Sequence, residues 1–120
     1  AQNAEKNQTA WFKELLLREE YILLVAKSND KVLGFIIGQI IKAPEVYDPG
    51  GLTLIVDDFC VVASNWQDIG TKLLNEIKKL AKANGVVQIV VVSGAHDEMK
   101  LSFLKKFGLS VASEWFVGKV

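Results

Sequence analysis

Residues 53–92 read TLIVDDFCVVASNWQDIGTKLLNEIKKLAKANGVVQIVVV, and this stretch decides the fold. The pattern predicts a strand over Thr53–Val62, an amphipathic helix over 65–84 and a second strand over Val86–Ser93. Gly85 is placed to end the helix in a left-handed cap. Apolar residues occupy both alternating sets of positions in the second strand, which predicts burial on both of its faces. A strand, a crossover helix and a buried strand form a βαβ unit with a parallel pair. The helix is expected to bury Ile69, Leu73, Leu74, Ile77, Leu80 and Ala81.

Two adjacent carboxylates, Asp57 and Asp58, lie in the middle of the first of these strands. A buried charge without a partner is costly, so their position needs a reason. Neighbouring residues of a regular strand point to opposite faces, and at most one of the two is expected to face a given cleft. A carboxylate beside a cleft is a candidate general base. The alternative is that one aspartate forms a salt bridge with a lysine and the other faces water at a strand bend.

The turn at 63–70 leads from the strand into the helix and is a candidate phosphate site. Backbone amides at a helix N-terminus hold phosphate groups, and Gly70 permits a close approach. However, Ser64 and Gln67 fit the S-x-x-Q capping box, which would use the first free amides internally. Asp68 favours the helix dipole but repels an incoming phosphate. A phosphate loop and an ordinary capped helix start both remain open.

The residues before this unit predict a helix and a hairpin. A helix is expected over Thr9–Glu20, because its apolar residues recur at helical spacing. Strands are expected over Tyr21–Ala26 and Lys31–Ile41, and the short turn between them predicts an antiparallel hairpin. Gly34 and Gly38 lie inside the second strand and indicate a bulge or a close approach of two backbones.

The remaining segments complete a mixed α/β sheet with helices on its faces. Both prolines and a Gly-Gly pair fall in residues 43–52, which predicts a mobile loop. A helix is expected over Asp97–Phe107, ended by Gly108, and a final strand over Ser110–Val120. Ser113–Trp115 in that strand are candidates for lining a pocket or a dimer interface, and core packing is the default expectation for Trp115.

Composition limits the classes of protein that this chain can belong to. Its 120 residues predict one domain over 9–120, preceded by a flexible polar segment over 1–8. Fourteen basic residues balance fourteen acidic ones, so neither a nucleic acid nor an anionic membrane is an expected partner. The single cysteine, Cys60, fits the cytoplasm and is expected to be a small buried hydrophobe rather than a nucleophile. His96, the only histidine, has no ligand partners at metal spacing, so no metal is expected.

Three runs of residues resemble one known family. Residues 31–38 (KVLGFIIG) resemble the third strand of the GCN5-related N-acyltransferases, the GNAT superfamily. Residues 57–62 with 70–74 resemble the family's acyl-CoA-binding strand and helix. Residues 102–109 (SFLKKFGL) resemble its penultimate helix and the turn that follows. The resemblance extends over residues 9–120, without a counterpart of the family's first strand and first helix.

The resemblance implies a transferase that moves an acetyl group from acetyl-CoA, as co-substrate, to an amine of a small molecule or peptide. Asp57 aligns with the family's catalytic base. Backbone groups of Cys60 and Val62 align with those that hold the pantetheine arm. The amides that align with the pyrophosphate site are those of Gln67, Asp68, Ile69, Gly70 and Thr71.

Two departures from the family pattern support a second reading. In the signature Gln/Arg-x-x-Gly-x-Gly/Ala, Gly70 fits the last position, but Asn65 and Asp68 occupy the other two. The family's tyrosine acid aligns with Leu104, which has no proton to donate. The alternative is a GNAT-like binding or dimerisation module without catalysis. Because the first strand is missing, the edge at Tyr21–Ala26 is expected to be exposed and to favour a homodimer.

Overall fold

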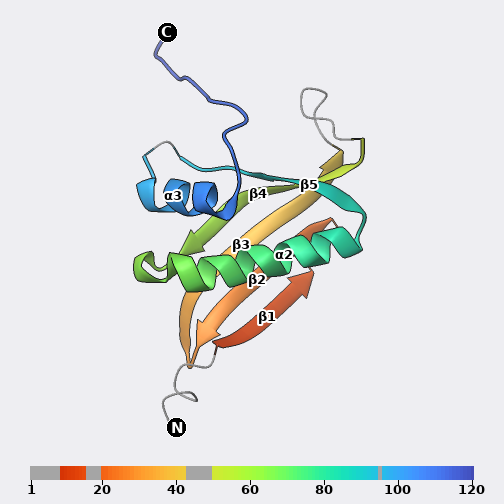
Figure 1. The fold of residues 1–120 in the computed structure, drawn as a ribbon, viewed down its shortest axis with the longest axis vertical. Coiled ribbons are helices and arrows are strands. Elements are labelled where there is room, and N and C mark those ends of the chain that lie inside the picture. The colour runs from red at the N-terminus through yellow and green to blue at the C-terminus, as the bar shows by residue number, and fades with distance from the viewer. Residues whose placement is uncertain (1–8, 16–19, 43–49, 95) are drawn as a thin grey trace.

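The computed structural model describes residues 9–15, 20–42, 50–94 and 96–120, and these form a mixed sheet with two α-helices. The sheet has five strands in the order β1-β2-β3-β4-β5 (Figure 1). Neighbours are antiparallel from β1 to β4, and β5 runs parallel to β4. The strands are β1 (Thr9–Leu15), β2 (Tyr21–Ser28), β3 (Lys31–Lys42), β4 (Leu52–Val61) and β5 (Val86–Val91). The mixed α/β class and the parallel βαβ unit are therefore confirmed.

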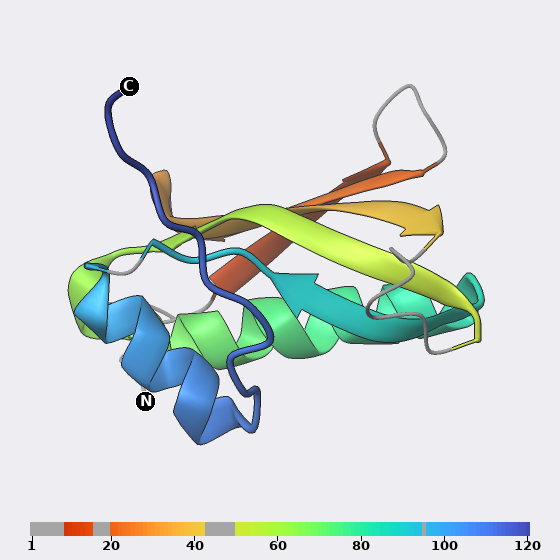
Figure 2. The same ribbon diagram turned by 90° about the horizontal axis from the view of Figure 1, so that it is seen from above.

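The two helices lie on the same side of the sheet (Figures 1 and 2). After β4 the chain forms a 3-10 turn, η2 (Ala63–Asn65), and a π turn, η3 (Trp66–Gly70), and then α2 (Thr71–Ala83). α2 packs across β2, β3 and β5, whereas α3 (Glu98–Phe107) packs against η3. No helix in the described part of the chain is long and apolar enough to cross a bilayer.

The core lies between α2 and the sheet. Alternate residues of each central strand face the helix, as the period of a strand dictates, and the register places them side by side across the sheet. The face of α2 that the sequence predicts to be buried is buried in the structure, although Leu80 is only partly buried. The side chains that meet in this layer include Ile22, Leu24, Ile36, Leu54, Val56, Leu73, Leu74 and Ile77.

The ends of both α-helices follow the sequence signals. Gly85 follows the last turn of α2 with a φ of 84°, in the left-handed region that favours glycine. Asp97 caps α3, where its carboxylate accepts the backbone N–H of Lys100 at 3.3 Å. Gly108 ends that helix with a φ of 111°. The predicted helix ends at Gly85 and Gly108 are therefore confirmed, whereas the cap at Asp97 was not predicted from the sequence.

The N-terminal prediction of a helix is wrong. Thr9–Leu15 forms strand β1, which pairs with β2 along its whole length from Thr9↔Ser28 to Leu15↔Ile22. Pairing satisfies the backbone groups along the edge of β2, which a helix at this position would leave open. The expected exposed edge at Tyr21–Ala26 is therefore also wrong, because β1 covers it. The expected flexible segment at 1–8 and most of the expected loop at 43–52 lie outside the described residues.

The C-terminal prediction of a strand is wrong as well. Residues 109–120 adopt no regular secondary structure, and Trp115 is 95% exposed instead of packed in the core. Consequently β5 has no described neighbour on its outer side, and its burial on both faces is not observed. Val86 is buried, but Val87 is 61% exposed.

Candidate active site

A β-bulge places both aspartates of β4 on one face of the sheet. Ile37 of β3 lies opposite Asp58, but the next residue, Gly38, lies opposite Val56, so Asp57 is the extra residue. Val56 and Phe59 on either side of the pair are both buried against the helix layer. Asp57 and Asp58 are therefore both turned to the other side and both are exposed. The expectation that they point to opposite faces is wrong, because a bulge interrupts the alternation on which it rests.

The two parallel strands separate at this bulge. The last pair between β4 and β5 is Val56↔Val91, and the N–H of Val92 donates to the carbonyl of Val56 at 2.9 Å. β4 continues to Val61, but no described residue after Val92 pairs with it on that side. Because a bulge bends its strand, Asp57 is the physical cause of the divergence. Among the described residues, β4 and β5 are therefore not paired beyond Val56 and Val91, and this divergence of the two strands is called the wedge.

Close contact with β3 fixes the outer half of β4. A Cβ atom on Gly34 would lie 2.8 Å from the carbonyl oxygen of Cys60, and one on Gly38 would lie 2.7 Å from Cδ1 of Leu54. The predicted close approach of two backbones is therefore confirmed. The β4 backbone that borders the wedge is held against β3 by glycine rather than by larger side chains.

The turn after β4 does not form the expected capping box. Neither η2, η3 nor α2 has a side-chain hydrogen bond at its N-cap. Ser64 instead donates its hydroxyl proton to Oδ1 of Asn65 at 3.3 Å. The helical turns begin at Ala63, so Ser64 lies inside the first turn and not at the cap position. The π turn that follows is an uncommon element that is enriched at functional sites.

One carboxylate, that of Asp68, is hydrogen-bonded to the backbone of this turn. Asp68 accepts the N–H of Ile69 at 2.7 Å, and its Oδ1 also accepts Nδ2 of Asn65 at 3.4 Å. An incoming anion would meet a negative charge at this amide. Gly70 is tightly packed here, because a Cβ atom would lie 3.0 Å from the ring of Trp66.

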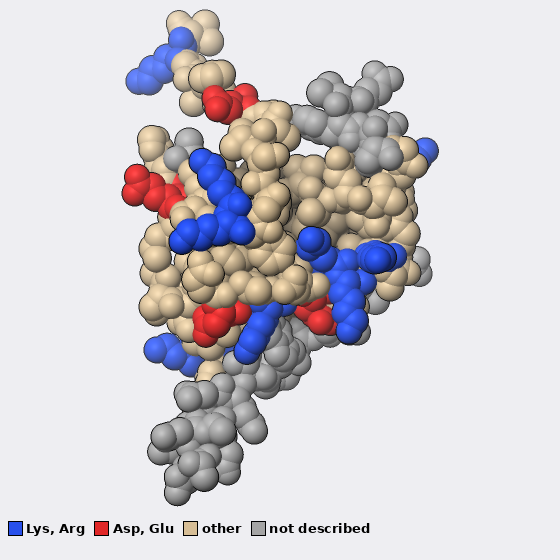
Figure 3. Space-filling model, viewed as in Figure 1, with Lys and Arg blue, Asp and Glu red and all other residues tan. Residues whose placement is uncertain are grey.

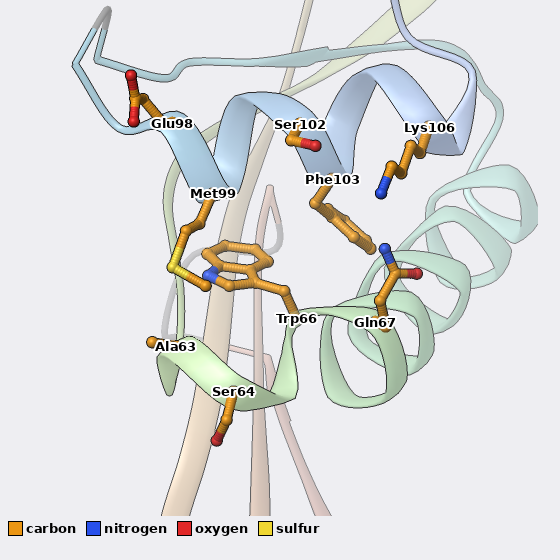
Figure 4. A pocket seen from close by; sticks show the side chains of 9 residues that line it. All are labelled: Ala63, Ser64, Trp66, Gln67, Glu98, Met99, Ser102, Phe103 and Lys106. Atoms are coloured by element: carbon orange, nitrogen blue, oxygen red, sulfur yellow. The ribbon is translucent and has the colours of Figure 1, made fainter.

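A cavity of about 340 Å³ lies between the turn and α3. This volume falls within the lower range of small-molecule sites. The side chain of Met99 points from α3 toward the indole of Trp66, and Gln67 and Lys106 extend toward one another at one end of the cavity (Figure 4). This cavity was not predicted from the sequence. The signal that could have indicated it is a tryptophan, Trp66, in a short polar turn. Its lining consists of Ala63, Ser64, Trp66, Gln67, Glu98, Met99, Ser102, Phe103 and Lys106.

Contacts between aromatic rings join the turn to β4 and α3. The rings of Phe59 and Trp66 meet edge to face with centroids 5.0 Å apart, and those of Trp66 and Phe103 are 5.3 Å apart. Lys100 is buried, and its ammonium lies 5.8 Å from the centroid of the Phe59 ring. These contacts hold η3 and α3, whose residues line the cavity, against β4.

The other candidates from the sequence fall into different environments. Cys60 is exposed beside the wedge, so the expectation of a small buried hydrophobe is wrong. Leu104 is buried in the core. Neither aspartate forms an ion pair with another described residue, so the salt-bridge alternative is not observed. Among the pyrophosphate candidates, the exposed residues are Gln67 and Asp68, the partly buried one is Thr71, and the buried ones are Ile69 and Gly70.

Comparison with known proteins identifies the family. The sequence model of the acetyltransferase (GNAT) family matches residues 2–109, and the chain therefore belongs to this family. No curated protein sequence matches the chain. No cluster of three or more potential metal ligands occurs among the described residues.

Solved structures share the fold at low sequence identity. An aminoglycoside acetyltransferase, HMB0005, from an uncultured soil metagenomic sample is 22% identical with a TM-score of 0.70, over 88% of this chain and 70% of that one. AAC(6')-Iy in complex with the bisubstrate analog CoA-S-monomethyl-acetylneamine is 11% identical with a TM-score of 0.73, over 88% and 73%. A transcriptional regulator from Bacillus halodurans C-125 is 17% identical with a TM-score of 0.69, over 87% and 69%.

Proposed function

We propose that the protein is an acyl-CoA-dependent N-acyltransferase that moves an acetyl group from acetyl-CoA to the primary amine of a small molecule or peptide. The observation that carries this proposal is the wedge between β4 and β5, which opens at the bulged Asp57 and continues into the helical turn at 63–70. Membership of the GNAT acetyltransferase family supports the reaction class. A likeness of fold does not supply the acceptor.

The geometry of the wedge suits an extended thioester arm. Such an arm needs backbone donors and acceptors along its length, and β4 from Asp57 to Val61 has such groups on the side that β5 does not pair. The backbone groups of Cys60 and Val62, which the sequence assigns to the arm, do not face the wedge. The N–H of Val62 donates to the carbonyl of Leu33 at 2.9 Å, its carbonyl accepts the N–H of Asn65 at 2.8 Å, and the carbonyl of Cys60 lies against Gly34 of β3. Because backbone groups alternate along a strand, those of Val61 would hold the arm instead, and the turn amides would face its pyrophosphate. Lys106, in the lining of the adjacent cavity, adds a positive charge for the phosphates.

In the proposed reaction, Asp57 accepts a proton from the acceptor's ammonium group, directly or through a water molecule. The neutral amine then attacks the thioester carbonyl, and a C–N bond forms as the carbonyl electrons move onto oxygen. A backbone N–H of β4 beyond Asp57 donates to this oxyanion. When the oxyanion collapses, the C–S bond breaks and the attacking nitrogen releases its second proton to water. The thiolate takes a proton from water or from the exposed Cys60, and the proton released by the nitrogen restores that donor. Leu104 contributes no proton.

Thermal melting with and without acetyl-CoA tests the proposal first. A ligand at 100 times its Kd stabilises the folded state by about 2.7 kcal/mol, which raises Tm by several degrees in a domain of this size. The second assay measures release of free coenzyme A thiol in the presence of an aminoglycoside, a polyamine or a peptide with a free amine. Stabilisation together with amine-dependent thiol release supports the proposal. The absence of a shift at millimolar acetyl-CoA contradicts it.

A second candidate, a GNAT-like binding module without catalysis, is supported by two specific observations. The carboxylate of Asp68 already accepts the N–H of Ile69, and Leu104 is buried at the position of the family's acid. One structural neighbour is named a transcriptional regulator. A thermal shift with acetyl-CoA but no thiol release with any of the amines favours this second candidate.

A further inference from the structure

Lys100 of α3 is a buried lysine whose ammonium group has no polar partner. It is 7% exposed, whereas the other lysines of this helix, Lys105 and Lys106, are exposed. Basic side chains also stand out from the surface over α2 and α3 (Figure 3). In the described part of the chain the ammonium forms no hydrogen bond or ion pair, and it faces the ring of Phe59 at 5.8 Å from the centroid. A charge buried without such a partner destabilises the folded state.

The position of Lys100 in its helix adds to this cost. It lies in the first turn of α3, where the positive end of the helix dipole disfavours a cation. The acidic residues nearby do not neutralise it. Asp97 accepts the backbone N–H of Lys100 at 3.3 Å, and neither Asp97 nor Glu98 forms an ion pair with its ammonium among the residues that the structure describes. A residue whose charge opposes both burial and the helix dipole is typical of a functional site.

The ammonium of Lys100 lies on the helix side of the wedge. Within the described ranges no fully buried side-chain nitrogen or oxygen lacks a partner, so the unpartnered nitrogen of Lys100 still reaches an opening. Phe59, whose ring it faces, belongs to the part of β4 that is no longer paired with β5. The ring of Phe59 is buried in the helix layer, whereas Asp57 and Asp58 are exposed on the other side. A cation and a carboxylate therefore approach the same stretch of β4 from opposite faces of the sheet.

We propose that Lys100 is a catalytic residue whose ammonium contacts the sulfur of the thioester and stabilises the departing thiolate, an assignment that rests on the proposed acyl transfer. The amine would enter from the side of Asp57, and the sulfur would lie on the side of Lys100. When the C–S bond breaks, its electron pair stays on sulfur. The ammonium keeps its own protons and donates a charge-assisted hydrogen bond to the thiolate, which takes its proton from water on release. Leu104, one turn further along α3, has no group that could do this.

Steady-state kinetics and thermal melting of Lys100→Met test this assignment together. Methionine keeps the apolar stem of the side chain and removes the charge. We expect kcat for acetyl transfer to fall by about 100-fold, as for the loss of one donor to a developing negative charge, with little change in the KM for acetyl-CoA. Because the buried charge opposes folding, the Tm of the variant should equal or exceed that of the unchanged chain. Lys105→Met, at an exposed position of the same helix, is the matched control and should keep both the rate and the Tm.

Calorimetric titration with coenzyme A and with desulfo-coenzyme A, which lacks the sulfur, tests the contact without turnover. At mildly alkaline pH the unchanged chain should bind coenzyme A about tenfold more tightly than desulfo-coenzyme A, and Lys100→Met should bind the two about equally, because removal of either group abolishes the interaction between them.

A lysine that only covers apolar surface with its stem predicts different results. The same preference for coenzyme A in both proteins, a lower Tm for Lys100→Met, or a rate equal to that of Lys105→Met overturns the assignment. The proposed transfer then still stands if acetyl-CoA raises the Tm of the unchanged chain and amines release thiol. If the unchanged chain binds neither coenzyme A nor desulfo-coenzyme A, the proposed transfer itself fails, and the role of Lys100 fails with it.

Discussion

At the scale of single residues, the bulge changes what the sequence Val-Asp-Asp-Phe means. In a regular strand the two carboxylates would alternate, and one of them would enter the apolar layer under α2. With Asp57 as an extra residue, Val56 and Phe59 both reach the core and both aspartates face solvent. The sequence contains a signal for this, because two adjacent polar residues inside an apolar strand break the period of two. Periodicity alone could not say which of them is the additional one.

Replacement of Asp57 by asparagine tests its proposed role as the base. Asp57→Asn removes the proton acceptor and keeps the shape, so we expect the acetyl-transfer rate to fall by about 100-fold or more. The thermal shift with acetyl-CoA should change little. Asp58→Asn is the control, since it carries the same change one residue further along, and we expect it to retain most of the rate. If the Asp57 variant also loses the thermal shift, Asp57 has a structural role in the wedge.

Replacement of Asp68 tests whether its charge opposes cofactor binding. Asp68→Asn removes a negative charge from the first turn, next to the Ile69 amide. Helix-terminus charges act with a strength that corresponds to about a two- to fivefold change in an equilibrium constant. We therefore expect acetyl-CoA to bind about two- to fivefold more tightly, as measured by isothermal titration calorimetry. Asp30→Asn, in the turn between β2 and β3, controls for net charge. Weaker binding by the Asp68 variant would show that its carboxylate takes part in the site.

At the scale of elements, the wedge depends on how closely β3 and β4 approach each other. The Cβ of an alanine at position 34 would lie 2.8 Å from the carbonyl oxygen of Cys60, a backbone atom that cannot move without shifting β4. We expect Gly34→Ala to lower the free energy of unfolding by about 1–3 kcal/mol in urea denaturation. Gly94→Ala is the control, because a Cβ atom at that position would have no neighbouring atom within 4 Å. Equal effects at the two positions would mean that the contact is easily relieved.

The aromatic contacts of α3 provide a second test at this scale. Phe103 is buried and packs against both Phe59 and Trp66. We expect Phe103→Ala to destabilise the protein by about 3–5 kcal/mol in thermal or chemical unfolding. Met99→Ala, on the same helix, removes a side chain that is 51% exposed and should have a much smaller effect. If the two effects are alike, α3 contributes little to the stability of the fold.

The elements that the sequence predicts well are those whose partners are near in the chain. The hairpin of β2 and β3, the crossover through α2 and the helix ends at Gly85 and Gly108 all depend on local signals. The region at Thr9–Leu15 has helical spacing of its apolar residues but is a strand, because pairing with β2 outweighs the local preference. Of the candidate site, the strand and turn were predictable, but the cavity was not, since it needs α3 to pack on η3.

At the scale of the whole molecule, the C-terminal segment leaves Trp115, Phe116 and Val117 uncovered. If copies of the chain associate through this segment, Tm should rise with protein concentration, because association stabilises the folded state by mass action. Differential scanning calorimetry of the full chain over a hundredfold range of concentration measures this effect. A chain that ends at Leu109 should show a constant Tm, and a constant Tm for both versions would show that the segment does not mediate association.

The extra residue of β4 also has a consequence for how this site can be lost. Removal of one codon, that of Asp57, would restore the regular period of the strand and keep every large side chain of the core in place. β4 and β5 could then pair over a longer stretch, and the wedge beside Asp58 would close. A single in-frame deletion would thus remove the proposed acyl-transfer site from a lineage while the domain keeps its fold.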